Sequence, residues 1–356
     1  DDTIDGGDGE DTIAVNADFD ISGGTTDLNN VSNIEQIGLG DNNVDVTVDD
    51  LSLSAFSDNT INAVVTDDFN NTSLDASGVQ NSNASINFDA SKVEGANSAT
   101  FTISNGNDTF TGAEGDDTVN VTDDVFVSGN DTLDGADGDD TLNFSAADDA
   151  GNDQTVNAAQ LDGVQNFEVL NFSDDNGNTE EFEVTLSSEF VGNNLDANGE
   201  LEITVQNNDG NDSVDVDASS APGSGILVFS GGGRDDTFVG GAADDVIDGG
   251  QGDDDLTGGT GDDDFVYAAG DGEDTIQDFD FGADDSVVDQ LDFSAFAAEA
   301  DLGTADGDID GVANASDGGL DLSNGQEVLV LDTQAYADAA AAEDAVQALN
   351  NVQNGD

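Results

Sequence analysis

The stretch GGQGDDDLTGGTGDDDF, from Gly249 to Phe265, contains the same nine-residue pattern twice in succession. Each unit opens with two glycines, has a third glycine at position 4 and an aspartate at position 6, and carries one apolar residue at position 8. Repeated glycines allow the backbone to bend sharply, and a single apolar residue two places after the aspartate suits a very short strand with one buried side chain. The stretch therefore predicts tight turns that alternate with short strands.

The nine-residue unit recurs along the chain and can be followed by its aspartate and the apolar residue two positions later. These aspartates are Asp2, Asp11, Asp108, Asp117, Asp131, Asp140, Asp212, Asp236, Asp245, Asp254, Asp263 and Asp274. The longest uninterrupted run extends from Asp236 to Asp263, and Arg234 and Ala243 replace the third glycine in two of its units. Asp212 stands alone, so a flexible acidic linker is the alternative interpretation at that position.

The charge of the chain excludes several classes of function. Among 356 residues, 82 are acidic and 2 are basic, which gives a formal net charge of −80. With Lys92 and Arg234 as the basic residues, binding of nucleic acid through its phosphates is excluded. The absence of cysteine and histidine removes disulfides, thiolate metal sites and the commonest general base. No apolar run approaches the roughly 20 residues that span a bilayer, and no catalytic constellation stands out among so many carboxylates.

High charge with low hydrophobicity normally indicates disorder, but the apolar residues here are regularly spaced. Short runs such as VDVTV, LEITV, FEVTL and ILVF are β-branched or aromatic and are bounded by Asn, Asp and Gly, which is typical of strands and turns. The Ala-rich segment 332–352 is the exception and predicts a helix. We therefore expect an ordered all-β protein that needs cations to fold, with one short C-terminal helix.

A longer repeat lies beneath the nine-residue one. VSNIEQIGL, beginning at Val31, matches VQNFEVLNF, beginning at Val164, with Glu35 and Glu168 at the same position of the match. Tandem modules of this kind favour a solenoid, in which each coil is buried by its neighbours. We predict two related modules at 1–104 and 105–229, a terminal roll with its capping segment at 230–296, and a C-terminal acidic loop and helix region at 297–356. The chain opens on the tail of a nine-residue unit, so we expect a piece of a longer protein.

The unit supplies the ligands that a hard dication prefers. Calcium takes six to eight oxygen ligands from carboxylates and backbone carbonyls. Two units make one coil of a flattened spiral, so every second turn stacks on the same edge, with Asp236 over Asp254 and Asp245 over Asp263. A cation between stacked turns would receive oxygens from both and would neutralise aspartates that otherwise repel at close range.

The pattern G-G-x-G-x-D-x-(apolar)-x resembles the nonapeptide repeat of the RTX calcium-binding proteins. The resemblance is strong over Ser230 to Ile276 and clear at 1–14, 105–120 and 128–143. It implies right-handed parallel β-solenoid or β-roll modules, bound Ca²⁺, and folding outside a Gram-negative cell after type I secretion. The segment from Asp274 to Phe296 is similar to the end of an RTX roll, and Asp278 in it is a further candidate ligand. The sparse units among Asn/Thr/Val-rich strands resemble RTX-type surface-layer proteins and large adhesins.

A second cation motif is DGDIDGVANASD, in which acidic residues alternate before a glycine. Its candidate ligands are Asp306, Asp308, Asp310 and Asp317. The spacing is that of an EF-hand loop with aspartate in place of the final glutamate. The flanking segments do not have the pattern of helices, so a solvated acidic loop is the alternative.

Three functions fit these observations. The first is a non-enzymatic structural protein that binds calcium and assembles into a homo-oligomer or polymer, as a surface layer or extracellular filament. The second is an adhesin stalk, and the third is the secretion and folding appendage of a larger secreted enzyme. Cell-surface polysaccharide is a further candidate partner for an extracellular protein of this kind.

Overall fold

A computed structural model describes most of the chain. The described residues are 4–15, 19–20, 31–40, 44–50, 55–56, 59–66, 71–122, 130–146, 154–174, 181–207, 213–268, 270–280, 289–292, 319–322 and 327–331. They form two compact units. Unit 1 comprises 1–148, 156–173 and 193–196, and unit 2 comprises 149–155, 174–192 and 197–356. The finer division of the chain at 104, 229 and 296 stays a prediction.

Unit 1 contains two parallel sheets, and successive strands along the chain belong alternately to one sheet and the other. In chain order, one sheet consists of β2 (Thr12–Val15), β5 (Gln36–Leu39), β7 (Thr60–Val65), β9 (Ser85–Asp89), β11 (Thr109–Thr111), β13 (Thr132–Asp134) and β16 (Val164–Gln165). The other consists of β3 (Phe19–Asp20), β6 (Val44–Asp49), β8 (Thr72–Gly78), β10 (Ala99–Thr102), β12 (Thr118–Thr122), β14 (Thr141–Ala146) and β17 (Val169–Asp174). A separate short pair joins β1 (Ile4–Asp5) to β4 (Val31–Ser32).

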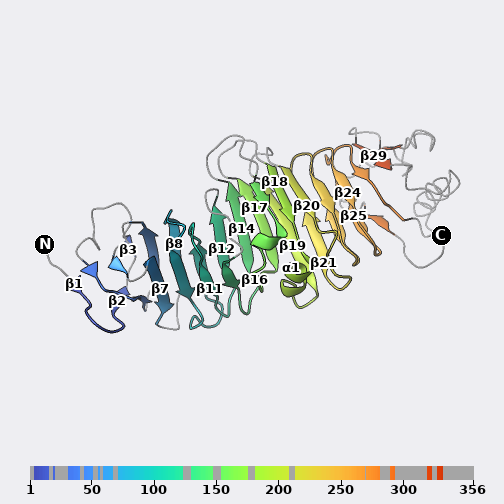
Figure 1. Cartoon of the computed structure of the whole chain (residues 1–356). Coiled ribbons are helices and arrows are strands. Elements are labelled where there is room, and N and C mark those ends of the chain that lie inside the picture. The colour runs from blue at the N-terminus through green and yellow to red at the C-terminus, as the bar shows by residue number, and fades with distance from the viewer. Residues whose placement is uncertain are drawn as a thin grey trace. The chain divides into compact units, whose positions relative to one another are not determined.

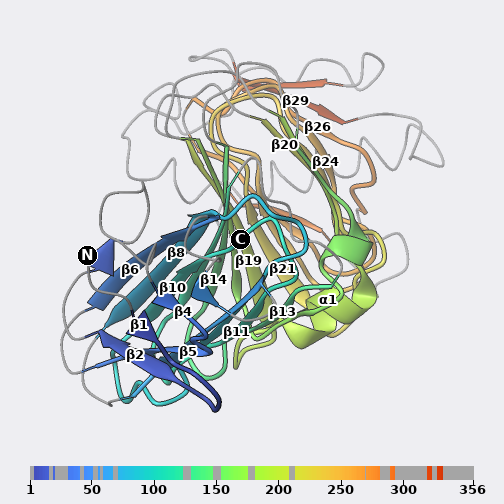
Figure 2. The ribbon, with the colours of Figure 1, turned by 60° about the vertical axis from the view of Figure 1, so that its left-hand side comes forward.

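The alternation means that every coil of unit 1 contributes one strand to each sheet. Figure 2 separates the two sheets, with β6, β8, β10 and β14 in one and β2, β5, β11 and β13 in the other. The register is parallel, so that Phe110 pairs with Phe88 on one side and Leu133 on the other. Strands of one sheet follow each other in chain order (Figure 1). This is the stacking of a β-solenoid, in which each coil is covered by its neighbours.

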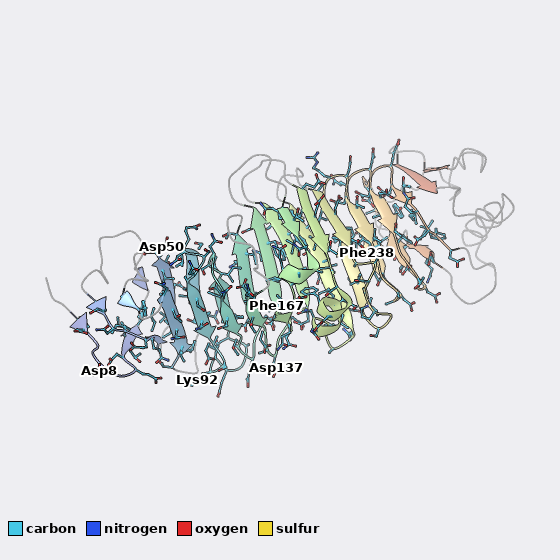
Figure 3. The ribbon with its side chains drawn as sticks, in the orientation of Figure 1. Asp8, Asp50, Lys92, Asp137, Phe167 and Phe238 are labelled. Atoms are coloured by element: carbon cyan, nitrogen blue, oxygen red, sulfur yellow. The ribbon has the colours of Figure 1, made fainter. Side chains whose placement is uncertain are left out.

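The core of unit 1 follows from the two-residue period of the strands. Strand β12, for example, buries Val119 and Val121 and leaves its alternate residues half-exposed. The inward positions carry aromatic rings that stack between coils, and Phe88, Phe101 and Phe110 lie with ring centroids 5.7 to 5.9 Å apart. Figure 3 shows Phe167 among the strands, and this side chain is fully buried as well. Apolar burial between the sheets is therefore the main stabilising contribution to this thin core.

Unit 2 has the same alternation of strands between two sheets. One sheet consists of β15 (Gln154–Val156), β18 (Glu181–Thr185), β20 (Ser213–Asp217), β22 (Thr237–Val239), β24 (Asp255–Thr257), β26 (Thr275–Ile276), β29 (Glu327–Leu331) and β28 (Gly319–Leu322). The other contains β19 (Glu200–Asn207), β21 (Ile226–Ser230), β23 (Val246–Asp248), β25 (Asp264–Val266) and β27 (Gln290–Asp292).

The nine-residue units form the three-residue strands of unit 2. Phe238 pairs with Leu256, and Ile247 pairs with Phe265, so each apolar residue meets the one that lies two units further along the chain. Each of these apolar residues is at most 1 % exposed. Phe229 and Phe238 stack with their ring centroids 4.5 Å apart, and Figure 3 shows Phe238 among the strands. The prediction that two units make one coil and bury one apolar residue each is confirmed here.

The all-β parallel architecture is confirmed, with two local corrections. The sequence predicted one helix, near the C-terminus, but a further helix, α1 (Ser188–Asn193), follows β18 and the strand-forming run FEVTL. The Ser187 hydroxyl accepts the Phe190 N–H at 3.0 Å and caps this helix, whose Phe190 and Val191 are buried.

The second correction is that β28 and β29 pair in the antiparallel sense, as strands separated by few residues of sequence can. A 3-10 helix at Ala158–Gln160 completes the regular elements among the described residues. The predicted helix at 332–352 lies outside those residues. No helix in the described ranges is long and apolar enough to cross a bilayer.

Candidate metal sites

The aspartates of the nine-residue units point inward at the turns. Asp236, Asp245, Asp254 and Asp263 are each at most 2 % exposed, although each carries a carboxylate. The other buried members of the set are Asp108, Asp117, Asp131, Asp140 and Asp274. Buried carboxylates are rare unless they are hydrogen-bonded and paired with positive charge, so this row of side chains is the strongest chemical feature of the fold.

In unit 2 the buried aspartates form a hydrogen-bonded ladder on one edge of the coil. Asp254 Oδ1 accepts the backbone N–H of Asp236 at 2.8 Å, and Asp274 Oδ1 accepts the N–H of Asp254 at 3.0 Å. Asp236 Oδ1 accepts in turn from Val214 N–H at 2.7 Å. Each carboxylate therefore joins its own turn to the preceding coil, and Asp236 is stacked with Asp254 as the two-unit coil predicted.

The opposite edge of unit 2 carries a second ladder. Asp245 Oδ1 accepts Leu227 N–H at 2.8 Å, and Asp263 Oδ1 accepts Asp245 N–H at 2.9 Å. Asp289 continues this ladder, since its Oδ1 accepts Asp263 N–H at 3.1 Å. Asp289 was not among the sequence candidates, although it precedes Leu291 with the same aspartate-x-apolar spacing.

Unit 1 repeats the ladder with longer coils. Asp117 Oδ1 accepts Ala99 N–H at 2.6 Å, and Asp140 Oδ1 accepts Asp117 N–H at 2.7 Å. On the other edge, Asp131 Oδ1 accepts the N–H of Asp108 at 2.8 Å. The spacing between bonded turns rises to 23 residues here, because these coils contain more residues than two nonapeptide units.

The second carboxylate oxygens divide the aspartates into two groups. Asp117 Oδ2 and Asp245 Oδ2 accept N–H groups of their own turns, from Ala113 and Gly241. In contrast, Oδ2 has no hydrogen-bond partner, although the atom is buried, in Asp11, Asp140, Asp236 and Asp254. A buried carboxylate oxygen without a donor is costly, so these four atoms are the ones that a bound cation would satisfy.

Glycine at the first position of each unit leaves room beside these oxygens. A methyl group built on Gly231 would lie 2.4 Å from Asp236 Oδ2 and 2.4 Å from the carbonyl oxygen of Gly249. A methyl group on Gly249 would lie 2.2 Å from Asp254 Oδ2. The missing side chain thus creates a small space that is bordered by one carboxylate and a main-chain carbonyl of the next coil.

The position of Arg234 explains why glycine is dispensable there. A methyl group on Gly252 would lie 2.1 Å from the Arg234 carbonyl oxygen, and one on Gly261 would lie 2.1 Å from the Ala243 carbonyl oxygen. At Gly252 and Gly261, position 4 therefore needs glycine because a carbonyl of the preceding coil lies against it. Arg234 and Ala243 stand in the first two units of the run, and they still present their carbonyls to the next coil.

Burial changes the acid–base behaviour of the ladder. Loss of water raises the pKa of Asp236 from 3.8 to about 9, and the negative charge of Asp254 raises it as well. Burial likewise raises the pKa of Asp140 to about 8 and that of Asp263 to about 7. These values describe the chain without bound ions, in which the carboxylates lack positive partners.

The donor set fits calcium. Each turn offers one charged oxygen, neighbouring carbonyls and a space made by glycine, and calcium prefers oxygen ligands of these two kinds. No three acidic side chains converge on one point in the described part of the chain, so main-chain carbonyls would complete the shell. A bound calcium ion would supply the positive charge that Asp11, Asp140, Asp236 and Asp254 lack. The role of the nine-residue aspartates as ligands stays a prediction.

A second, outer row of carboxylates reinforces the stacking. Asp235 Oδ1 accepts Asp253 N–H at 2.9 Å, and Asp253 Oδ1 accepts Glu273 N–H at 3.0 Å. Asp244 accepts the Asp262 N–H in the same way, at 2.8 Å. The outer aspartate thus bonds to the following coil, whereas the inner one bonds to the preceding coil. The Asp-Asp pair ties each turn to both of its neighbours.

The remaining sequence candidates lie elsewhere. Asp278 binds a turn rather than joining the ladder, since its two oxygens accept Gly258 N–H at 3.0 Å and Gly259 N–H at 2.9 Å. Six candidates fall outside the described residues, namely Asp2, Asp212, Asp306, Asp308, Asp310 and Asp317. Asp108 is buried, but both of its oxygens are engaged by Ser104, and Oδ1 also accepts Ile86 N–H.

The raised pKa values predict that protons and calcium compete. Since the folded pKa of Asp236 lies above 3.8, protonation stabilises the calcium-free fold fully below pH 3.8, and this stabilisation is lost as the pH rises through about 9. Calcium must displace that proton, so calcium affinity should increase from pH 6 to pH 9 and then level off. Calorimetric calcium titrations in buffers of different ionisation heat would measure the released protons. Equal affinity across this range without proton release would contradict the buried-ligand geometry.

Comparison with known proteins agrees with this geometry. The model of the RTX calcium-binding nonapeptide repeat matches the chain in four stretches, at 1–21, 104–123, 128–154 and 230–265. No curated protein and no solved structure shows significant similarity to the chain. The RTX repeat is a structural, calcium-binding motif and not a catalytic one. These four stretches, in which the buried aspartates of the ladder are concentrated, match the RTX calcium-binding nonapeptide repeat.

Proposed function

We propose that this chain is an extracellular structural protein that folds on binding calcium and assembles with copies of itself into a surface layer or filament. The observation that carries the proposal is the ladder of buried carboxylates at the stacked turns. Asp236 and Asp254 lie on consecutive coils, each with a buried oxygen that has no hydrogen-bond partner. With 82 acidic and 2 basic residues, the chain cannot supply the neutralising charge itself.

The need for an external cation favours an extracellular setting. Calcium sites of extracellular proteins are filled at about 10⁻⁴–10⁻³ M calcium, far above cytosolic levels. In a low-calcium compartment, repulsion among the inward carboxylates would keep the coils apart. The same chain would fold when it meets millimolar calcium, which suits a protein that is exported before it folds.

The surface favours assembly through ions and strand ends. Among the described residues, Ile4 is the large apolar side chain that stands out, at 53 % exposed. The described surface therefore offers no broad apolar face through which copies could associate. Among the described strands of unit 1, β2 and β3 stand last in their sheets, and a strand at a sheet edge can pair with another chain. Calcium would also reduce repulsion between two acidic surfaces.

Assembly should therefore depend on calcium. Sedimentation velocity at high protein concentration is expected to show species larger than the monomer at millimolar calcium and their dissociation with EGTA. Electron microscopy of the same material should show an ordered lattice or fibres. Isolated rods would favour an adhesin stalk instead, and a monomer under all of these conditions would contradict assembly and favour an appendage of a larger protein.

A further inference from the structure

Two short turns of unit 1 stand where nonapeptide turns would otherwise continue the stack. We call them the Asn-x-Glu turns, and they comprise Asn33–Glu35 and Asn166–Glu168. Both lie outside the four stretches that match the RTX repeat. Each immediately follows, in the stack of coils, a nonapeptide turn whose aspartate has a buried oxygen without a partner, Asp11 in one case and Asp140 in the other.

Backbone hydrogen bonds align the start of the turn with a nonapeptide unit. Within the regular array, Gly231 N–H donates to the carbonyl of Asp248, the residue before Gly249. In unit 1, Gly135 N–H donates to the carbonyl of Gln165 at 3.1 Å. Gln165 therefore takes the place of Asp248, and the next residue, Asn166, takes the place of the first glycine of a unit.

Hydrogen bonds align the end of the turn as well. In the regular array, Asp255 N–H donates to the carbonyl of Asp236, so the residue before Asp255 is the ligand aspartate. In unit 1, Val169 N–H donates to the carbonyl of Asp140 at 3.0 Å. Glu168 therefore takes the place of the ligand aspartate. The path from the first glycine to the aspartate spans six residues in a nonapeptide turn, and the Asn-x-Glu turn covers it in three.

The asparagine provides the carbonyl that a nonapeptide turn would provide. Asn166 has a positive φ of 57°, and its carbonyl oxygen lies 1.9 Å from a methyl group built on Gly135, beside Asp140 Oδ2 at 2.5 Å. The turns of Gly112 and Gly135 are two stacked nonapeptide turns one coil earlier. There, a methyl group on Gly112 would meet the Gly135 carbonyl at 2.0 Å and Asp117 Oδ2 at 2.3 Å. The two spaces have the same walls, and asparagine tolerates the left-handed backbone conformation that the shorter turn requires.

The glutamate takes over the role of the ladder aspartate. Glu168 Oε2 accepts the backbone N–H of Asp140 at 2.8 Å, as Asp140 Oδ1 accepts the N–H of Asp117 at 2.7 Å. The additional methylene of glutamate compensates for the shorter turn. A second negative charge thus reaches the coil of Asp140, which is fully buried and retains an oxygen with no hydrogen-bond partner.

The first Asn-x-Glu turn repeats these features at the other end of unit 1. Asn33 also has a φ of 57°, and its carbonyl oxygen lies 2.1 Å from a methyl group built on Gly6. Glu35 Oε2 accepts the N–H of Asp11 at 2.9 Å. The Asn33 amide donates to Asp5 at 2.7 Å, just as the Asn166 amide donates to the aspartate before Gly135 at 2.6 Å. Because two turns far apart in the sequence have the same contacts, the Asn-x-Glu turn is a recurring structural element of this chain.

We propose that each Asn-x-Glu turn closes a calcium site at the end of a nonapeptide array. The ligands at one site are Asp140 Oδ2, the Asn166 carbonyl oxygen and the Glu168 carboxylate. At the other they are Asp11 Oδ2 and the carbonyl of Asn33 with the carboxylate of Glu35. This inference rests on the proposed calcium binding of the nonapeptide turns. It assigns to the sites of Asp140 and Asp11 two ligands each that the nonapeptide pattern does not contain, so the last ion site of each array is completed by a turn of a different kind.

Counting bound ions tests the proposal. Native mass spectrometry of the full chain at saturating calcium should show one ion fewer for Glu168→Gln, one fewer for Glu35→Gln, and two fewer for the double variant. Glutamine retains an oxygen that can accept the N–H bond, so the coil should stay in register while the charge is lost. Circular dichroism at the same calcium concentration would verify the β signal of each variant.

Two matched variants separate the ligands from general effects of charge and sequence. Glu202→Gln removes an exposed glutamate of β19 and should retain every ion. Asn166→Gly preserves the main-chain carbonyl and permits the positive φ, so it should also retain every ion despite losing the side-chain bond to Asp134.

The outcomes also separate this inference from the proposed function. A wild-type chain without bound calcium would overturn both. A calcium-loaded wild type with an unchanged ion count in Glu168→Gln and Glu35→Gln would overturn the inference alone. A single variant that sheds more than one ion would also contradict it, because the geometry assigns one ion to each turn.

Discussion

Chelating calcium should remove most of the β-sheet signal of the protein, and restoring calcium should bring it back. Ions that bind only the folded state stabilise it by about 2.7 kcal/mol per site when calcium exceeds its dissociation constant a hundredfold. Four sites, one at each nonapeptide aspartate whose buried Oδ2 has no partner, would together contribute about 11 kcal/mol, which is comparable to the 5–15 kcal/mol stability of a typical domain. Circular dichroism during an EGTA titration at fixed ionic strength measures the transition.

Monovalent salt provides the control for this titration. Sodium chloride screens the repulsion among the carboxylates but does not coordinate them, so it should substitute poorly for calcium. A β signal that survives complete chelation at low salt would contradict calcium as the folding switch. In that case the acidity of the chain would reflect a saline environment instead.

Replacing Asp254 by asparagine should change stability in opposite directions with and without calcium. Asparagine retains an acceptor for the Asp236 N–H, so the ladder bond can persist, but the charged ligand is lost. In calcium we expect a loss of about 2.7 kcal/mol or more, with weaker binding at the stacked sites next to it. Without calcium, the variant should be more stable than the wild type, because a buried unpaired charge is gone.

The matched control for this variant is Asp137→Asn. Asp137 is an exposed residue of a nonapeptide turn, labelled in Figure 3, and its replacement changes the charge by the same amount. Urea unfolding of both variants with and without calcium is the measurement. Equal behaviour of Asp254→Asn and Asp137→Asn would mean that burial of Asp254 has no consequence for calcium binding.

Gly249→Ala tests the same site without a change in charge. The added methyl would lie 2.2 Å from Asp254 Oδ2 and would fill the space beside it. We expect a reduced calcium dependence in addition to an overpacking cost of about 1–3 kcal/mol. Gly192→Ala is the control, since a methyl there meets nothing within 4 Å and alanine favours the helix α1.

The sequence predicted the repeating part of this structure well because the repeat is local and strict. The alternation of turns between two edges placed Asp236 over Asp254, and the apolar residue of each unit identified Phe238, Leu256 and Phe265 as core. Glycine and aspartate at fixed positions leave few alternatives to a tight turn. The prediction extended even to the coil before Asp274, where two extra residues are accommodated without loss of the ladder bond.

The irregular parts were less predictable because they depend on contacts between coils. The alignment of VSNIEQIGL with VQNFEVLNF was visible in the sequence, but the role of Glu35 and Glu168 was not, since their turns are shorter than a nonapeptide turn. Two hydrogen bonds, from the Val169 N–H to the Asp140 carbonyl and from the Asp140 N–H to Glu168 Oε2, reveal that a glutamate stands in the place of an aspartate. The helix α1 escaped prediction for a similar reason, because Phe190 and Val191 are apolar residues that a strand would also bury.

In some ladder aspartates the two carboxylate oxygens have different environments, which the sequence did not suggest. One oxygen of Asp254 accepts a backbone N–H of the preceding coil, so stacking is encoded in the polypeptide itself. The other oxygen is buried without a partner. The oxygen that fixes the register is therefore a different atom from the one that we propose as the calcium ligand. This division would explain how a chain with a net charge of −80 holds a defined stack and, as we propose, needs calcium to do so.

Anomalous diffraction from crystals grown in calcium tests the central claim most directly. The account predicts one calcium ion within about 2.3–2.6 Å of Asp236 Oδ2 and a second ion at the same distance from Asp254 Oδ2. Main-chain carbonyls of the adjacent turns should be among the ligands of each ion. Anomalous peaks confined to exposed carboxylates, with Asp236 and Asp254 in contact only with protein or water, would contradict it.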